Sequence, residues 1–300
     1  MLNGKLFVGV DGGGTKCRAR ISDMDGTILG EGRGGPANTR LGLDVAFGSI
    51  VAATDIALAS AGLELDRKKD LYAGLGLAGV SLQRERHLLA LFGHPFKSMT
   101  IESDAYIACL GAHGGQNGGI LILGTGSCGC AITDGVEQTV GGWGFEISDY
   151  GSGAFIGHQA VRRSLLAFEG VVPMGGLAIE VMDRLGNSPE RAVPWAEKAT
   201  PSLYGAFAPL VSHWAEDGDP MAVDIMRQAG YDTGLLLRAL KGTGTERLVL
   251  AGGVAEAIRP WLSEEVKSWL VEPIGDALAG ALLLAQMRCH GEECRGGLYA

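Results

Sequence analysis

One pattern occurs twice in this chain of 300 residues, and it limits the possible folds more than any other feature. An apolar run from Lys5 to Val10 is followed by Asp11-Gly12-Gly13-Gly14-Thr15, by alternating apolar and polar residues, and by an Asp-Gly turn. Residues 119–140 repeat this order, with Gly124-Thr125-Gly126-Ser127 in the place of the first glycine turn. Such alternation is typical of half-buried strands, and Asp-Gly is typical of a hairpin. Two such meanders predict a duplicated domain.

Alternating helices and strands follow each meander. The order in the first half is βββαβαβα, and the second half resumes it after a helical insertion at 152–241. Parallel strands joined by helices predict an α/β protein of two lobes, with a ligand-binding cleft between them. We expect an N-terminal lobe at 1–116 and a C-terminal lobe at 117–275, with a last helix, from about 276 to 300, that packs back on the first lobe. The expected helices lie at 43–61, 81–92, 105–112, 254–258 and 276–288, and the further strands at 71–77, 99–101 and 247–250.

Composition excludes several classes of protein. The 25 Lys and Arg against 34 Asp and Glu give a net charge of −9, so we expect no nucleic-acid partner. Hydrophobic residues make up 46%, which excludes a disordered chain. No unbroken run of about 18 apolar residues is present, so no membrane span is expected. Six cysteines without a CxxC pair indicate reduced thiols in a cytoplasmic protein, and Cys289-His290 with Cys294 fit ordinary thiols better than a metal site.

The glycine turns do not match the common nucleotide motifs. In Asp11–Lys16 the threonine precedes the lysine and a strand follows, whereas a Walker A loop or a dinucleotide fingerprint opens a helix. A single glycine turn can be a plain tight turn, but two equivalent turns favour phosphate binding by bare backbone amides. A third segment runs from a strand at Leu248 into Gly252-Gly253 and a helix. Its glycines and the small Ala257 leave room for a flat purine.

These three segments resemble the phosphate-1, phosphate-2 and adenosine motifs of the sugar kinase/Hsp70/actin superfamily. Gly35-Pro36-Ala37-Asn38, Ser103-Asp104-Ala105 and the stretch from Gly141 to Gly153 narrow the resemblance to the BadF/BadG/BcrA/BcrD ATPase family, in its N-acetylglucosamine and glucosamine kinase branch. The resemblance covers nearly the whole chain. It implies two RNase H-like lobes, ATP and Mg2+ as cofactors, and a homodimer with the 152–241 helices as contact surface. The Cys-x-Cys-Gly zinc cluster of the ROK kinases is absent from the sequence.

The resemblance also implies which residues meet the substrates. Asp104 is expected to be the catalytic base. The nucleotide is expected to contact Gly12, Gly13, Gly14, Thr15, Lys16, Gly124, Thr125, Gly126, Gly252, Gly253 and Ala257. The sugar is expected to contact Asn38, Asp104, Ser127, Cys128, Gly142, Trp143, Gly144 and Asp149.

Several of these residues have a purely structural alternative. Asp11, directly before three glycines, can hold Mg2+ through its water shell or bond the turn. Asp104 follows a short strand and opens a helix, so it can cap the helix, accept the proton of a sugar hydroxyl, or do both. Asp149 precedes a second helix start and raises the same choice. Flanking glycines predict an exposed Trp143 ring, and Asp276 is expected only to cap the last helix.

The leading interpretation is an ATP-dependent kinase that phosphorylates the 6-hydroxyl of glucosamine, with N-acetylglucosamine as the alternative. Glu146 and Asp149 offer acceptors to a cationic amine, which favours the free amino sugar. A 2-hydroxyacyl-CoA dehydratase activator of the same family would need two cluster cysteines. Cys109 stands near one of these positions, and Asp149-Tyr150 occupies the other. A sugar-sensing regulator would need a DNA-binding segment, and only ten residues precede Asp11.

Overall fold

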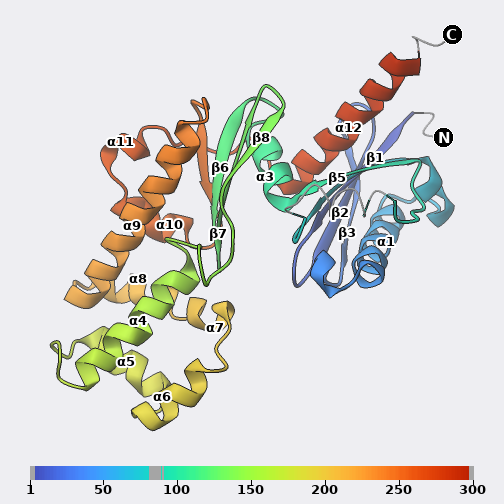
Figure 1. Ribbon diagram of the computed structural model, residues 1–300. Helices are drawn as coiled ribbons and strands as arrows, with labels where there is room; N and C mark the ends of the chain where they lie inside the picture. The colour runs from blue at the N-terminus through green and yellow to red at the C-terminus, as the bar shows by residue number, and fades with distance from the viewer. Residues whose placement is uncertain (1–3, 81–88, 90, 297–300) are drawn as a thin grey trace. The chain divides into compact units, whose positions relative to one another are not determined.

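The computed structural model describes residues 4–80, 89 and 91–296, and it forms two compact units (Figure 1). Unit 1 comprises Met1–Gly118 together with Glu272–Ala300, and unit 2 comprises Gly119–Val271. Each unit contains one β-sheet with helices packed against it. The α/β class and the two duplicated meanders predicted from the sequence are confirmed.

Unit 1 is built on a five-stranded sheet in the order β3-β2-β1-β4-β5. The strands β1 (Leu6–Gly12), β2 (Cys17–Ser22) and β3 (Ile28–Gly34) form the antiparallel meander. β4 (Leu71–Leu77) and β5 (Ser98–Ser103) extend the sheet, and both run parallel to β1. The carboxyl ends of β1, β4 and β5 therefore meet at one edge, where α/β proteins commonly bind ligands.

Three described helices pack on this sheet. α1 (Leu43–Ser60) lies against β2 and β3, while α3 (Asp104–Ala112) and α12 (Ala277–Gly296) pack together, and α12 also covers β1 and β4. α3 and α12 approach so closely that a Cβ on Gly280 would lie 1.8 Å from the Ile107 carbonyl oxygen. The expected helix at 81–92 lies almost entirely outside the described residues.

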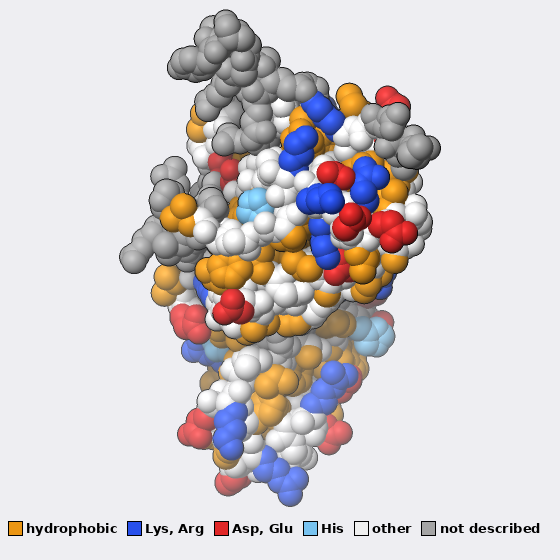
Figure 2. All heavy atoms as spheres, turned by 90° about the vertical axis from the view of Figure 1, so that its right-hand side faces the viewer, with side chains coloured by type: hydrophobic (Ala, Val, Ile, Leu, Met, Phe, Trp, Pro, Cys, Tyr) orange, Lys and Arg blue, Asp and Glu red, His pale blue; other side chains and the backbone are white. Residues whose placement is uncertain are grey.

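The predicted cap of the last helix is confirmed. The Asp276 carboxylate accepts a hydrogen bond from Ala279 N at 2.9 Å, and the same carboxylate pairs with Arg20 at 2.8 Å. Arg20 also binds Glu31 at 2.6 Å. Arg20 thus connects the meander to the start of α12. On the face of unit 1 shown in Figure 2, basic and acidic side chains lie next to one another rather than forming a surface of one charge.

By length and composition, α1 is the one described helix apolar enough to cross a membrane. Part of that composition belongs to the core, because Phe47, Ile50 and Leu58 are buried in the cluster of unit 1. These apolar residues of α1 therefore serve the core of unit 1.

Unit 2 has a four-stranded sheet in the order β8-β7-β6-β9. Its meander consists of β6 (Gly118–Leu123), β7 (Ser127–Thr133) and β8 (Val136–Gly141), and β9 (Leu248–Ala251) runs parallel to β6. At the place that corresponds to β5 of unit 1, the structure has a single bridge, in which Leu270 pairs with Leu248. The duplication is thus complete in the meander and incomplete at the far edge of the sheet.

The insertion between β8 and β9 is helical, as the sequence predicts. Its longest helices, α4 and α9, pack on each other, and α9 also contacts β7 and β8. The core of unit 2 therefore joins the sheet to the insertion. The helices of the insertion are α4 (Gly153–Phe168), α5 (Gly176–Arg184), α6 (Pro189–Ala196), α7 (Pro201–Gly205), α8 (Ala208–Glu216) and α9 (Pro220–Lys241). Two short helices, α10 (Ala255–Ile258) and α11 (Glu264–Lys267), follow β9.

Candidate functional site

The first glycine turn is a tight hairpin between β1 and β2. Gly13 N donates to the Lys16 carbonyl oxygen at 2.9 Å, and Ala37 N donates to the Gly13 carbonyl oxygen at 3.0 Å. Gly12 is buried at the base of the turn, whereas residues 14–16 are exposed. The exposed part offers the amides of Gly14 to Lys16, a hydroxyl and an ammonium group to an anion.

Asp11 forms an ion pair with Arg18 instead of bonding the turn. Arg18 donates to Asp11 Oδ2 from Nη2 at 2.7 Å and from Nε at 3.2 Å. Among the described residues, no hydrogen bond reaches Oδ1 of Asp11. The strand register sets Arg18 opposite Asp11 and Arg33 opposite Arg18, so all three side chains share one face of the sheet. The pair fixes the Asp11 carboxylate and leaves one oxygen for another ligand.

Asn38 lies beside the same turn. Its Oδ1 accepts a hydrogen bond from Arg40 N at 2.9 Å and so caps a short 3-10 helix. Its Nδ2 would be 3.9 Å from a Cβ on Gly14. Gly79, at a φ of 87°, makes room for Asn38, because a Cβ there would lie 2.7 Å from Oδ1. The structure thus brings Asn38 to the first turn.

Asp104 is the first residue of α3, and the expectation that it caps this helix is wrong. Ser103 is the cap, because its Oγ accepts from Tyr106 N at 3.0 Å. Asp104 is exposed, and its Oδ1 accepts from Ala105 N at 2.9 Å. Desolvation by the surrounding protein raises the pKa of this carboxyl, the negative charge of Asp11 raises it further, and the Ala105 N–H lowers it. A raised pKa suits a carboxylate that must accept a proton.

The second glycine turn lies between β6 and β7 and is bound to the start of α4. Gly124 N donates to the Gly126 carbonyl oxygen at 2.9 Å. The first amides of α4 then hold the turn, with Gly153 N at 2.8 Å from the Gly124 carbonyl oxygen and Ala154 N at 3.1 Å from that of Thr125. Thr125 itself is exposed. The positive end of the α4 dipole therefore lies next to an exposed hydroxyl, an arrangement suited to phosphate.

Asp149 supports this second turn through a buried hydrogen bond. It is 8% exposed, and its Oδ1 accepts a hydrogen bond from Ser127 N at 3.1 Å. Burial raises its pKa, the Ser127 N–H lowers it, and the charge of Glu146 raises it. Its expected alternative as a helix cap is wrong, because Ser152 Oγ caps α4 by accepting from Phe155 N at 3.2 Å.

The glycine-rich segment after β8 holds Trp143 in solvent. Gly142 and Gly144 adopt φ angles of 78° and 100°, in the region that favours glycine. A Cβ on Gly142 would lie 2.8 Å from Cys128 Sγ, so Cys128 packs directly beneath this segment. The Trp143 ring is 60% exposed, as the flanking glycines predict. The two glycines thus bring the exposed Trp143 next to Cys128 on β7.

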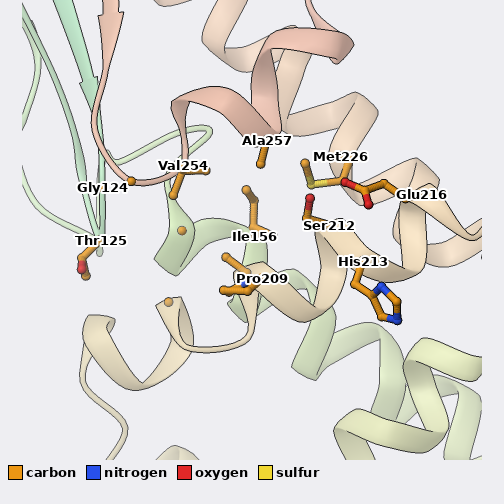
Figure 3. A pocket seen from close by; sticks show the side chains of 14 residues that line it. Gly124, Thr125, Ile156, Pro209, Ser212, His213, Glu216, Met226, Val254 and Ala257 are labelled. Atoms are coloured by element: carbon orange, nitrogen blue, oxygen red, sulfur yellow. The ribbon is translucent and has the colours of Figure 1, made fainter.

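A pocket of about 510 Å³ opens beside the second glycine turn (Figure 3). Gly124 and Thr125 lie at one end, and Ser212, His213 and Glu216 lie at the other (Figure 3). The further lining residues that Figure 3 labels are Ile156, Pro209, Met226, Val254 and Ala257.

The glycine pair after β9 shapes one wall of this pocket. Gly252 has a φ of 100°, and a Cβ on it would lie 2.2 Å from the Leu123 carbonyl oxygen. Gly252 is therefore required for the chain path. Gly253 has no atom within 4 Å of its Cβ position and lines the open space, as does Ala257. The structure thus brings Gly124, Thr125, Gly253 and Ala257 together around one cavity.

The sequence did not reveal the opposite wall of the pocket. Ala208, Pro209 and Ser212 come from α8, and Met226 comes from α9, both far along the chain from the glycine turns. The helical insertion carries no local motif, so its contribution follows from the packing of α4, α8 and α9. Arg18 was also missed, although its place seven residues after Asp11 on a hairpin makes a cross-strand pair possible.

Among the described residues, no group of three or more His, Cys, Asp and Glu side chains is arranged to hold a metal ion. Cys289 is buried in unit 1, and the side chains of His290 and Cys294 lie outside the described ones. A metal ion at Asp11 would therefore need ligands from a bound substrate and from water.

Comparison with known proteins gives one consistent result. The chain is 43% identical to the glucosamine kinase GspK of Vibrio cholerae, over 93% of this chain and 95% of that protein. It is 28% identical to the N-acetyl-D-glucosamine kinase of Dictyostelium discoideum, over 84% of this chain and 86% of that protein. A crystal structure from Chromobacterium violaceum, assigned as an N-acetylglucosamine kinase, superposes with a TM-score of 0.86 at 36% identity and covers 94% of this chain and 99% of that one.

More distant structures share the fold alone. A ROK family glucokinase from Streptomyces griseus, solved with glucose and AMPPNP, gives a TM-score of 0.51 at 21% identity, over 94% of this chain and 99% of that one. The two-unit α/β architecture is therefore that of the sugar kinases. The family model of the BadF/BadG/BcrA/BcrD ATPases matches residues 8–285, which is most of the chain, and the protein belongs to that family.

Proposed function

We propose that this protein is an ATP-dependent kinase that transfers the γ-phosphate of ATP to the 6-hydroxyl of glucosamine. The observation that carries the proposal is the pocket of unit 2, which joins an amide-rich glycine turn to a largely apolar cavity. A nucleoside triphosphate has the matching shape, with an anionic tail and a flat apolar base. The 43% identity to the Vibrio cholerae glucosamine kinase supports glucosamine as the acceptor.

Unit 2 would hold the nucleotide. Its cavity of about 510 Å³ lies within the usual range of about 300–1,000 Å³ for small-molecule sites. The purine would lie against Gly253 and Ala257, where no side chain fills the space. The phosphates would lie at Thr125, next to the first turn of α4. Backbone amides placed in advance stabilise phosphate charge without reorganisation.

Unit 1 would supply two carboxylates, at Asp11 and Asp104. Mg2+ commonly binds one or two carboxylates and completes its shell with phosphate oxygens and water, and the free Oδ1 of Asp11 fits that need. When bound with ATP, Mg2+ neutralises charge on the β- and γ-phosphates. Asp104 would accept the proton of the attacking hydroxyl, because it begins α3 directly after the carboxyl end of β5 and its pKa is raised. Gly14, Thr15 and Lys16 would contact phosphate oxygens through the exposed part of the first turn.

The remaining sugar contacts would come from residues beside the two turns. Asn38 lies at the first turn, while Cys128, Trp143 and Asp149 lie at or next to the second. Asp149 would act there both as a sugar ligand and as the support of Ser127. The family resemblance further supports a homodimer in the cytoplasm that uses the 152–241 helices as its contact, which sedimentation velocity would test.

N-acetylglucosamine is the second candidate acceptor. The Dictyostelium relative and the Chromobacterium structure both favour it. A dehydratase-activator function is disfavoured, because Cys109 is buried in α3 with its Sγ 3.3 Å from the Gly118 carbonyl oxygen. Such a thiol is not available to a cluster shared with another subunit.

The test is ADP release from ATP and Mg2+ over a panel of hexoses and amino sugars. We expect the highest kcat/KM with glucosamine. A higher kcat/KM with N-acetylglucosamine would make that sugar the preferred acceptor and leave the kinase assignment intact. A rate of ADP release that no sugar changes would overturn the proposed function.

A further inference from the structure

Unit 2 contains a second cavity that the proposed nucleotide site does not use. It measures about 480 Å³ and lies along the segment from Phe145 to Tyr150. One wall is α4, through Phe155, His158 and Gln159, and the opposite wall runs from α6 to α7, ending at Tyr204. The cavity therefore begins where the glycine-rich segment of Trp143 ends.

The walls of this cavity are aromatic. Phe145 stacks on Tyr204 with ring centroids 5.6 Å apart, and His158 meets both rings edge-on, at 5.5 Å and 5.1 Å. Burial and the nearby Arg162 lower the pKa of His158, so its imidazole is neutral at physiological pH. Ring faces carry partial negative charge, which attracts a cation placed over them.

Glu146 brings a full negative charge to the same cavity. It is exposed, it lines the cavity, and its Oε2 would be 3.7 Å from a Cβ on Gly144. Its charge raises the pKa of the buried Asp149. Within the part of the chain that the structure describes, neither of these two carboxylates forms an ion pair. Two neighbouring carboxylates without a basic partner would be stabilised by a cationic ligand.

Ser127 connects the buried Asp149 to the second glycine turn. Ser127 is 2% exposed, and its Oγ has no hydrogen-bond partner among the described residues. The backbone N–H of the same residue holds Asp149 at 3.1 Å. Ser127 Oγ is buried and the backbone of Ser127 fixes the Asp149 carboxylate, so the exposed Glu146 is left to meet a ligand.

We infer that Glu146, at the mouth of the aromatic cavity, binds the ammonium group of the amino sugar and selects the charged sugar over its N-acetylated form. The inference rests on the proposed kinase function and names the residue behind its acceptor preference. An ammonium group matches both a carboxylate and the part-exposed ring of Phe145, which Tyr204 backs by stacking on it. An acetamide is larger and neutral, and it would cover Glu146 without neutralising it, which is costly.

The decisive experiment compares Glu146→Gln with wild type on glucosamine, N-acetylglucosamine and glucose. We expect kcat/KM for glucosamine to fall by about 10- to 100-fold, the range of a lost charge-assisted hydrogen bond, while the value for glucose changes less than threefold. Glu169→Gln, at the exposed end of α4, is the matched control and should leave all three values unchanged. The Michaelis constant for ATP should be the same in every variant.

A binding measurement without turnover gives an independent readout. Calorimetric titration of the wild type with glucosamine and with glucose should show tighter binding of glucosamine, and Glu146→Gln should remove the difference. An unchanged preference in Glu146→Gln, with an active enzyme, would overturn the role of Glu146 alone. A wild type that releases no ADP in response to any sugar would overturn the proposed function and this inference together.

Discussion

The two glycine turns occupy equivalent places in two similar meanders, yet they are held in different ways. The first turn follows a carboxylate on its own strand, Asp11, which Arg18 neutralises from the next strand at 2.7 Å. The second turn has no carboxylate of its own, and Asp149 reaches Ser127 N from a segment 22 residues further along the chain. The first turn is thus supported by a half-exposed ion pair and the second by a buried hydrogen bond.

The backbone groups that donate hydrogen bonds to the two turns also differ. The carbonyl oxygens of the first turn accept from connecting segments, with Ala78 N donating to Gly12 at 2.8 Å. Those of the second turn accept from Gly153 and Ala154, the first amides of α4. The first turn therefore follows a carboxylate that keeps one oxygen for a cation, whereas the second lies at the positive end of a helix suited to anions. The two halves thus share the geometry of the meander and differ in the chemistry beside its first turn.

The largest effect on turnover is expected at Asp104, in the unit that carries the first turn. Asp104→Asn should lower kcat by about 10²–10⁴-fold, because a base contributes that much to such a step. ATP binding should not change. If the variant retains most of its turnover, Asp104 is a structural residue and not the base that accepts the proton of the sugar hydroxyl.

The same substitution makes a prediction for stability. The pKa of Asp104 is raised in the folded protein, so the carboxyl binds its proton more tightly there than in the unfolded chain. Stability therefore falls as the pH rises from the unfolded pKa through the folded one, and the ionised form is a cost at neutral pH. Asp104→Asn should melt at the same temperature or higher at pH 7, and a clear loss of Tm would contradict the pKa argument.

The raised pKa of Asp104 also predicts the pH dependence of the wild type. The pKa that describes the acid limb of its kcat/KM profile should lie above the usual range for an aspartate.

The second prediction concerns the nucleotide side. Gly253→Val should raise the Michaelis constant for ATP by about 10- to 200-fold, the range for one misplaced apolar group in a pocket. No atom lies within 4 Å of its Cβ position, so the protein should still fold. Gly48→Val, on the exposed face of α1 and equally free of close atoms, is the control. Gly252 is unsuitable, because a side chain there would strike the Leu123 backbone. Normal ATP dependence in a folded Gly253→Val variant would remove this wall from the nucleotide site.

The third prediction tests how the second turn is held. Asp149→Ala leaves the buried Ser127 N–H without its acceptor, which should cost about 1–3 kcal/mol of unfolding free energy. Asp149→Asn keeps an acceptor oxygen and should stay close to wild type in denaturant titration. Equal stability of the two variants would show that the hydrogen bond does not support the turn.

The smallest effect is expected at the ion pair of the first turn. Arg18→Ala should change stability by only about 0.2–1 kcal/mol, because both side chains are partly exposed. It should also lower the Mg2+ concentration needed for half-maximal activity, since the positive charge of the guanidinium no longer lies beside the carboxylate that would bind the cation. Arg227→Ala, which breaks an exposed pair with Asp224, serves as the control. A higher Mg2+ requirement in Arg18→Ala would mean that Arg18 assists the metal instead of repelling it.

The sequence predicts those parts of this structure that depend on local patterns. Strand alternation, glycine turns and the Asp276 cap are properties of a few adjacent residues, and all appear where expected. Ser103 and Asp104 are both good caps at one strand–helix junction, and only coordinates decide between them. The α8 wall of the pocket beside the second turn and the contact of Asp149 with Ser127 depend on residues distant in sequence, which no local pattern reveals.

The position of the transferred phosphate distinguishes a sugar kinase from a simple ATPase. The purified protein would be incubated with ATP, Mg2+ and glucosamine, and the products followed by phosphorus–proton correlation NMR. We predict one molecule of glucosamine 6-phosphate for each ADP, with the new phosphate coupled to the two protons on carbon 6. Release of ADP with inorganic phosphate, at one rate with or without sugar, would contradict the assignment of a sugar kinase.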